Sequence, residues 1–212
     1  MNLNLRVDDY PGTKPEEFTN HNLQNFKMFH NVLVKAGVKK YVLGVIPGYT
    51  MPADLQWLGK QEEIVVAIHG VAHNESHSDE FRDMTYRDIE NALSRVKSSF
   101  EATLGRRVVD YIPPHNTLNG DTVLALSRLG FDRIYGGPET SEEMADFVCM
   151  NGMDYIHSQV PCEYGRSDEL VVRGSVQYML DHPNSTLTLH WPWEWNIGLN
   201  SLRKYLELLN ND

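Results

Sequence analysis

Five acidic or imidazole side chains in this 212-residue sequence stand directly or closely after short apolar runs: Asp8, Asp9, His69, His115 and His190. Carboxylates and imidazoles transfer protons near neutral pH and bind divalent metals. If the apolar runs are parallel strands, their carboxyl ends meet on one face of a sheet or barrel, where catalytic groups gather. We therefore expect these five residues to share one site.

The pair His69 and His73 has a spacing of four residues. That spacing puts two imidazoles on one face of a helical turn, from which both can reach one cation. His69 ends an apolar run, where a charged imidazole is costly to bury and a neutral imidazole bound to a metal is not. A polar loop whose histidines cap backbone groups explains the same residues, so the spacing alone leaves both interpretations open.

Asp8 and Asp9 are adjacent, and neighbouring residues on a strand normally point to opposite faces. At a strand end the pleat relaxes, so both carboxylates can reach one site, one as a metal ligand and the other as a base. The alternative is a simple turn, because residues 8–12 read Asp-Asp-Tyr-Pro-Gly and Asp side chains bond nearby N–H groups in turns.

His190 suits a general acid, because histidine titrates near neutrality. Trp191, Trp193 and Trp195 follow it and offer flat apolar faces that suit a sugar ring or an acyl methyl group. Packing of the tryptophans in the core or in a lid is an equally good interpretation.

The composition restricts the partners. The formal net charge of −10 disfavours nucleic acid and anionic membranes, so we expect a small-molecule or saccharide substrate. No apolar run approaches the roughly 20 residues that cross a bilayer, and no basic-then-apolar leader precedes the first motif, which favours a cytoplasmic protein. Cys149 and Cys162 fit no disulfide framework, and we expect reduced thiols. The oligomeric state stays open.

Short apolar runs alternate with amphipathic stretches, which is the pattern of successive βα units. The expected strands are 3–7, 41–46, 64–68, 108–112, 131–135, 153–157 and 186–189. The expected helices are 15–36, 54–58, 85–104, 121–129, 142–147, 170–180 and 199–209. This α/β pattern fits an open doubly wound sheet or a (β/α) barrel short of one strand, in one domain over residues 1–212.

The chemically interesting residues, in their order along the chain, resemble the motifs of the polysaccharide deacetylases (NodB homology, carbohydrate esterase family 4). The Thr-Phe-Asp-Asp-Gly motif is similar to residues 6–10 and the His-(Ser/Thr)-x-x-His motif to residues 69–73. The Arg-x-Pro-aromatic-Gly motif is similar to residues 112–116, and the final Leu-His motif to residues 189–190. The resemblance implies an incomplete, distorted (β/α)7 barrel, in agreement with the seven expected strands.

The resemblance also implies roles. Asp9, His69 and His73 would bind a divalent metal, Zn²⁺ first and Mn²⁺, Fe²⁺, Co²⁺ or Ni²⁺ as alternatives. Asp8 would be the catalytic base and His190 the acid in a hydrolase that removes an N-acetyl or O-acetyl group from a carbohydrate or sugar conjugate. The residues expected to contact the substrate are Tyr10, Pro114, His115, Asn116, Trp191 and Trp193.

The sequence departs from the family pattern at three motif positions. Tyr10 replaces a Gly, Gly70 replaces the Ser or Thr, and Ile112 stands where the family has an Arg that orients the base. Arg6 lies two residues before Asp8 and shares its face of a strand, so Arg6 is our candidate for the missing guanidinium.

Arg133 and Arg173 are the alternatives to Arg6. The family's Asp-Trp motif has no match, and Asp132 is the nearest carboxylate. Two other functions therefore stay open, a hydrolase of a non-sugar amide on the same fold and an inactive carbohydrate-binding relative. The missing Arg favours the binding module, whereas the presence of both Asp8 and His190 opposes it.

Overall fold

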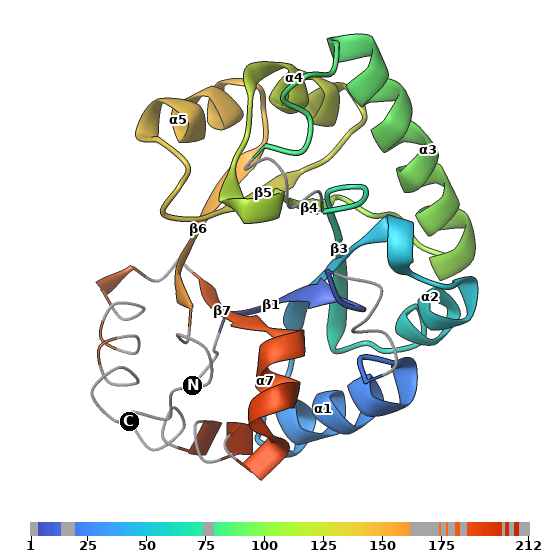
Figure 1. Cartoon of the computed structure of the whole chain (residues 1–212). Coiled ribbons are helices and arrows are strands. Elements are labelled where there is room, and N and C mark those ends of the chain that lie inside the picture. Colours follow the sequence, from blue (N-terminus) through green and yellow to red (C-terminus); the bar gives the residue numbers. More distant parts are fainter. Residues whose placement is uncertain are drawn as a thin grey trace.

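Seven parallel strands close a barrel in the computed structural model of the chain (Figure 1). The structure describes residues 4–13, 20–73, 79–161 and 186–200, with isolated residues between 174 and 207. The strands are β1 (Leu5–Tyr10), β2 (Tyr41–Val45), β3 (Ile64–His69), β4 (Asp110–Ile112), β5 (Arg133–Gly136), β6 (Asp154–Pro161) and β7 (Thr186–His190).

The strands pair in sequence order, and β7 returns to pair with β1, with His190 opposite Asp8. This closure excludes the open sheet and confirms a seven-stranded α/β barrel, one strand short of the common eight. The barrel is distorted at β4, which has three residues and pairs with β5 at only two positions.

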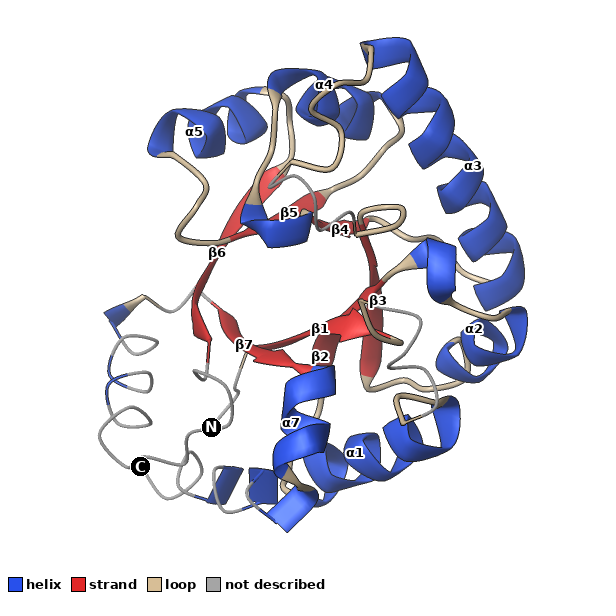
Figure 2. Cartoon of the chain, in the orientation of Figure 1, coloured by secondary structure: helices blue, strands red, loops and turns tan. Residues whose placement is uncertain are grey.

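The described helices surround the ring of strands (Figure 2). They are α1 (Leu23–Lys35), α2 (Pro52–Leu58), α3 (Tyr86–Leu104), α4 (Gly120–Arg128), α5 (Glu142–Met150) and α7 (Trp191–Ile197), with short 3-10 turns η2 (Pro47–Tyr49) and η3 (Pro114–Asn116). α3 follows its sequence signals closely. The Thr85 side chain accepts a hydrogen bond from the Asp88 N–H at its start, and Gly105 ends it in the left-handed conformation.

Two helix predictions need correction. α1 begins at Leu23, where the Asn22 side chain accepts a hydrogen bond from the Asn25 N–H. Residues 20–22 form a turn and not part of the expected helix 15–36, and residues 14–19 lie outside the described residues. The tryptophan run after His190 forms helix α7, which was not expected, although Pro192 and Glu194 in its first turn are typical of a helix start. The expected helix 170–180 lies largely outside the described residues, and so does much of 199–209.

The apolar core has two parts. The larger part lies between the strands and the helices, and a smaller cluster contains Val42, Ala67, Ile112 and Tyr135. The smaller cluster fills the barrel interior, because a Cβ added to Gly44 would meet Ile112 and Asp8 there. Polar side chains occupy the interior above this cluster, at the carboxyl ends of the strands.

Within the described part of the chain, no helix has the length and apolar character required to span a membrane. Cys149 is an exposed free thiol, and Cys162 lies outside the described residues.

Candidate metal centre and active site

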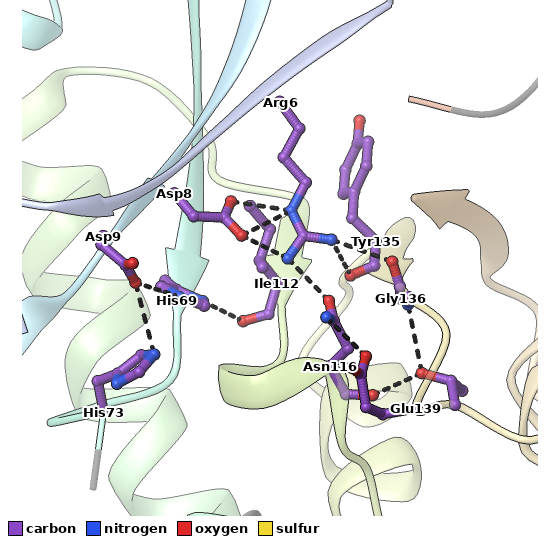
Figure 3. Close-up of polar contacts among 12 residues, drawn as sticks. Arg6, Asp8, Asp9, His69, His73, Ile112, Asn116, Tyr135, Gly136 and Glu139 are labelled. Carbon is purple, nitrogen blue, oxygen red and sulfur yellow. Dashed lines mark hydrogen bonds and ion pairs between the residues drawn. The ribbon is translucent and has the colours of Figure 1, made fainter. Parts of the chain in front are cut away.

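The side chains of Asp9, His69 and His73 converge at the carboxyl ends of β1 and β3 (Figure 3). Asp9 Oδ1 lies 3.1 Å from His69 Nε2 and 3.5 Å from His73 Nε2. Ligand atoms about 2.1 Å from a tetrahedral ion lie about 3.4 Å apart. The spacing and the donor set, two imidazoles and one carboxylate, therefore fit a single divalent cation such as Zn²⁺.

The backbone at Asp9 explains why two adjacent aspartates face one site. Asp9 has a φ of 69°, in the left-handed region, and the pairing of β1 with β2 shifts between Val7 and Tyr10. This irregularity breaks the strand alternation, so the Asp8 and Asp9 side chains both line the same cavity. A left-handed aspartate is strained, and such strain concentrates at functional sites.

The segment from His69 to His73 is not the helical turn that the spacing of four suggested. His69 ends β3, and residues 70–73 form a bend in which Gly70 has a φ of 64° and His73 a φ of 50°. The two imidazoles still meet, with ring centroids 4.9 Å apart. The sequence interpretation was correct about the convergence and wrong about the local structure that produces it.

Each imidazole presents Nε2 to Asp9. His69 Nδ1 lies 3.0 Å from the Ile112 carbonyl oxygen, which can only accept, so Nδ1 carries a proton and Nε2 is the nitrogen that would bind a cation. For His73, burial and the neighbouring His69 lower the pKa to about 4, so this imidazole is neutral at pH 7, as a metal ligand must be.

Asp9 is ionised in this environment. Burial opposes its charge, but the hydrogen bond from His69 and the imidazoles of His190, His69 and His73 together hold the pKa of Asp9 far below its ordinary value. An ionised carboxylate surrounded by imidazole nitrogens is the charge arrangement that attracts a cation.

Asp8 makes a buried ion pair with Arg6. Arg6 Nε lies 2.8 Å from Asp8 Oδ1, and Nη2 lies 2.6 Å from Oδ2. On its other side the guanidinium donates to the carbonyl oxygens of Tyr135 and Gly136 and to Asn116 Oδ1. Asp8 and Arg6 are about 2% and 1% exposed, so this bidentate contact fixes the carboxylate in a site with little water (Figure 3).

Arg133, the alternative to Arg6 that the structure describes, is engaged elsewhere. Arg133 Nε lies 2.5 Å from Asp110 Oδ1, at the amino end of β5, and the Tyr135 hydroxyl donates to the same carboxylate. Asp132 directly precedes β5, at the same remote end of the barrel. Arg173 lies outside the described residues.

A cavity of about 170 Å³ opens at the carboxyl ends of the strands and brings the candidate acid and base together. His190 and Asp8 both line it, and the His190 ring lies against Trp193, with centroids 4.7 Å apart. The lining residues are Arg6, Asp8, Asp9, Thr13, His69, His73, His115, Asn116, His190, Pro192 and Trp193.

Three of the six residues expected to contact the substrate line this cavity: His115, Asn116 and Trp193. The φ values of His115 and Asn116, 52° and 54°, turn both toward it from η3. Thr13 and Pro192 line it as well and were not anticipated.

The other three expected contacts are corrected by the packing. Tyr10 is fully buried and packs edge-on against Phe26. Trp191 is also fully buried, and its Nε1 donates to the Pro11 carbonyl. Pro114 is buried under the bend at Gly70. These residues support the site from the core and do not line the cavity.

A larger cavity, of about 720 Å³, lies at the opposite, amino ends of the strands. Lys40, Tyr41, Arg133 and Asp154 are among its lining residues. None of the three converging metal-ligand candidates reaches it, so size alone is a poor guide to the chemistry here.

Sequence reasoning missed two glutamates near the site. Glu139 accepts a hydrogen bond from Asn116 Nδ2 at 2.9 Å, and Glu80 contacts the bend between His69 and His73. Neither has a motif or a spacing that signals its role. Asn116 and Glu139 lie 23 residues apart, and Glu80 reaches back over eight or nine residues to the bend.

Glu194 gives a prediction about stability and pH. It is 3% exposed in α7, and burial raises the pKa of its carboxyl from 4.5 to about 7. The folded state thus binds this proton more tightly than the unfolded chain, so the associated stability is fully present below pH 4.5 and is lost as the pH rises through about 7. This pKa shift corresponds to a loss of about 3 kcal/mol in the free energy of unfolding between low and high pH.

We therefore expect Glu194→Gln to gain stability relative to the wild type between pH 5 and pH 8. Urea unfolding at the two pH values measures the change in the free energy of unfolding. The same pH dependence in both proteins would contradict this prediction.

Solved structures of other proteins share the fold. A putative polysaccharide deacetylase from Mycobacterium smegmatis superposes with a TM-score of 0.67 at 14% identity, over 99% of this chain and 84% of that one. The family 4 carbohydrate esterase from Streptomyces lividans, solved with acetate, gives 0.58 at 14% identity, over 99% and 88%. A CE4 family pseudoenzyme from Bacillus anthracis gives 0.57 at 15% identity, over 99% and 60%.

No protein-family model matches the sequence, and no curated protein matches it either. At these identities the structural likeness concerns the fold. The fold is that of the carbohydrate esterase family 4 deacetylases, as the order of the motifs predicted.

Proposed function

We propose that this chain, which has the fold of the carbohydrate esterase family 4 deacetylases, is a divergent member that removes an acetyl group from a carbohydrate or sugar conjugate with the help of a divalent metal. One observation carries the proposal. The Asp9–His69–His73 cluster, the Arg6-bound Asp8 and His190 all line a single small cavity.

Bound by Asp9, His69 and His73, the cation would polarise the acyl oxygen and make water more acidic. The residues of this chain supply the proton transfers. Asp8, held by Arg6, takes a proton from the attacking water, and His190 returns a proton to the leaving amine or alcohol. Because the site is buried, these charges act in a medium of low polarity, where they are strong.

The size and walls of the cavity support an acyl group as the part of the substrate that enters it. About 170 Å³ is small for a drug-sized ligand, whereas an acetyl group fits easily. The Trp193 indole offers a flat apolar wall beside His190. The rest of the substrate would lie outside, which leaves a non-sugar amide as the second hydrolase candidate.

The direct test is metal content together with acetate release. The purified protein is loaded with Zn²⁺ or another divalent metal and incubated with N- and O-acetylated saccharides and with acetylated non-sugar amides. Acetate release that requires the metal and a saccharide supports the proposal. Release from the non-sugar amides alone supports the second hydrolase candidate, and no release supports the following alternative.

A carbohydrate-binding protein without catalytic activity is the alternative, and the residue at position 112 favours it. Ile112 stands where the family has its base-orienting Arg, and one solved structure with this fold is described as a pseudoenzyme. The bidentate contact of Arg6 with Asp8 argues against this alternative, because it supplies a guanidinium to the base from β1, the strand of Asp8 itself, in place of one from β4.

Arg6 provides a prediction of its own. Arg6→Lys keeps a positive charge but loses the planar bidentate contact, so Asp8 is less well oriented. We expect kcat to fall about 10- to 100-fold, as for loss of an interaction that orients a catalytic group, with metal content unchanged. Arg6→Ala leaves Asp8 buried without its partner and should destabilise the fold by about 3–5 kcal/mol.

Kinetics and metal analysis on Arg6→Lys, with Arg133→Lys as the matched control, measure this effect. Arg133 binds a carboxylate at the opposite end of the barrel, so its replacement should leave kcat close to that of the wild type. Unchanged turnover in Arg6→Lys would reject the orienting role.

A further inference from the structure

We infer that Glu80 is a positioning residue that fixes the bend between the two metal-ligand histidines and thereby sets the affinity for the cation. Both oxygens of its carboxylate accept backbone hydrogen bonds from this bend. Oε2 lies 2.8 Å from the Val71 nitrogen, and Oε1 lies 2.6 Å from the Ala72 nitrogen. The inference deepens the proposed function and rests on it, because it assumes that Asp9, His69 and His73 bind a metal.

The bend needs support because its own conformation is unfavourable. Gly70 and His73 have positive φ values, and residues 70–73 belong to no helix or strand. A histidine in the left-handed region is strained by itself and persists only where its surroundings hold it. The two N–H groups at Val71 and Ala72 would otherwise lack a regular secondary-structure partner.

A backbone hydrogen bond and close packing also hold the bend, and the Glu80 carboxylate adds a charged acceptor to these contacts. The Gly48 N–H donates to the Val71 carbonyl at 2.7 Å. A Cβ at Gly70 would overlap with Glu80 Oε2 and with the Pro114 ring, so the backbone lies tightly between them. Position 70, where the family pattern has a Ser or Thr, is a glycine without a side chain here, and Glu80 supplies a side chain that bonds to the bend.

Glu80 is itself held in place on both sides. The neighbouring Asp79 accepts a hydrogen bond from Asn119, the residue that caps α4, at 2.8 Å. Phe81 is 3% exposed in the core. The backbone on both sides of Glu80 is therefore anchored, and the Glu80 carboxylate holds the backbone that leads to His73. Residues that orient metal ligands in this indirect way typically change metal affinity about 10- to 100-fold when they are replaced.

The test is the Zn²⁺ dissociation constant of the full chain, measured by competition with a chelator, alongside the unfolding midpoint without metal. Glu80→Ala removes both acceptors and should raise the Kd about 10- to 100-fold. Glu80→Asp keeps the charge but is too short to reach both N–H groups, and it should raise the Kd similarly. Glu80→Gln keeps the length and one oxygen, and its effect should be smaller.

The matched control is Glu62→Gln, which changes an exposed glutamate and should leave the Kd unchanged. Kd values within twofold of the wild type in folded Glu80 variants would overturn the inference, even if their unfolding midpoints fall. A raised Kd in Glu80→Gln together with a wild-type Kd in Glu80→Asp would also overturn the inference. The charge of residue 80 alone, and not its contact with the bend, would then explain the affinity. If the wild type binds no Zn²⁺ or other divalent metal, the proposed function fails first.

Discussion

Asp8→Asn should lower kcat by about 10²- to 10⁴-fold, the range that a general base contributes, while the protein keeps its metal. The amide cannot accept a proton from water at neutral pH, but it keeps the size of the carboxylate. Asp8 is not among the three converging ligands, so metal content should equal that of the wild type. A large loss of kcat with unchanged metal content would show that Asp8 acts as a base and not as a metal ligand.

The stability of this variant also has an expected sign. Arg6 would keep a hydrogen-bond acceptor but lose its charged partner in a site that is almost fully buried. The variant should therefore unfold more easily, by up to about 3 kcal/mol. Kinetics must be measured well below its unfolding midpoint, so that the loss of kcat reports chemistry.

Asp132→Asn is the matched control for Asp8→Asn. Asp132 is exposed and lies at the amino end of β5, so its replacement should change neither kcat nor the unfolding midpoint appreciably. If Asp8→Asn retained full turnover, another group would be the base and the mechanism above would be wrong. If it lost the metal, Asp8 would belong to the ligand set.

His69→Ala should lose both the metal and the turnover. Its imidazole is buried, lies 3.1 Å from Asp9 and is oriented by the Ile112 carbonyl, so its removal leaves only two of the three converging ligands. In the wild type, metal at 100 times its Kd should stabilise the fold by about 2.7 kcal/mol, or about 5–10 °C in the unfolding midpoint. In His69→Ala this shift should disappear.

Thermal unfolding with and without Zn²⁺, together with elemental analysis, measures the loss. His182→Ala is the matched control, because it removes an exposed imidazole from another part of the chain and should retain the shift. Full metal content in His69→Ala would show that the cation, if one binds, is held elsewhere. Retained turnover without metal would contradict the proposed function as a whole.

The order of strands and helices was predictable because it depends on local patterns. The apolar runs, the Thr85 cap and the Gly105 helix end are each encoded by a few neighbouring residues, and α3 forms where they indicate. The convergence of Asp9 with His69 was predictable for a related reason. Parallel strands place their carboxyl ends together, so a polar residue at each end reaches a common site.

The tryptophan run shows where local pattern failed. Once α7 forms, Trp191 and Trp195 lie four residues apart on one side of the helix, with their rings in contact, and Trp191 joins the core. Trp193 lies on another face and borders the cavity. The sequence predicted both Trp191 and Trp193 as substrate contacts, and only the direction of the helix places Trp191 in the core.

The sequence by itself determined that this chain forms βα units and presents two aspartates and three histidines at strand ends. The tertiary structure decided which residues support them: Arg6 as the guanidinium for Asp8, Asn116 and Glu139 beyond it, and Glu80 across the histidine bend. The reason is physical. Periodicity and caps depend on residues a few positions apart. The contacts of Arg6 with Asn116 and of Asn116 with Glu139 join segments that only the closure of the barrel and the packing of its loops bring within 3 Å, and those of Glu80 depend on how the loop after β3 folds back over eight or nine residues.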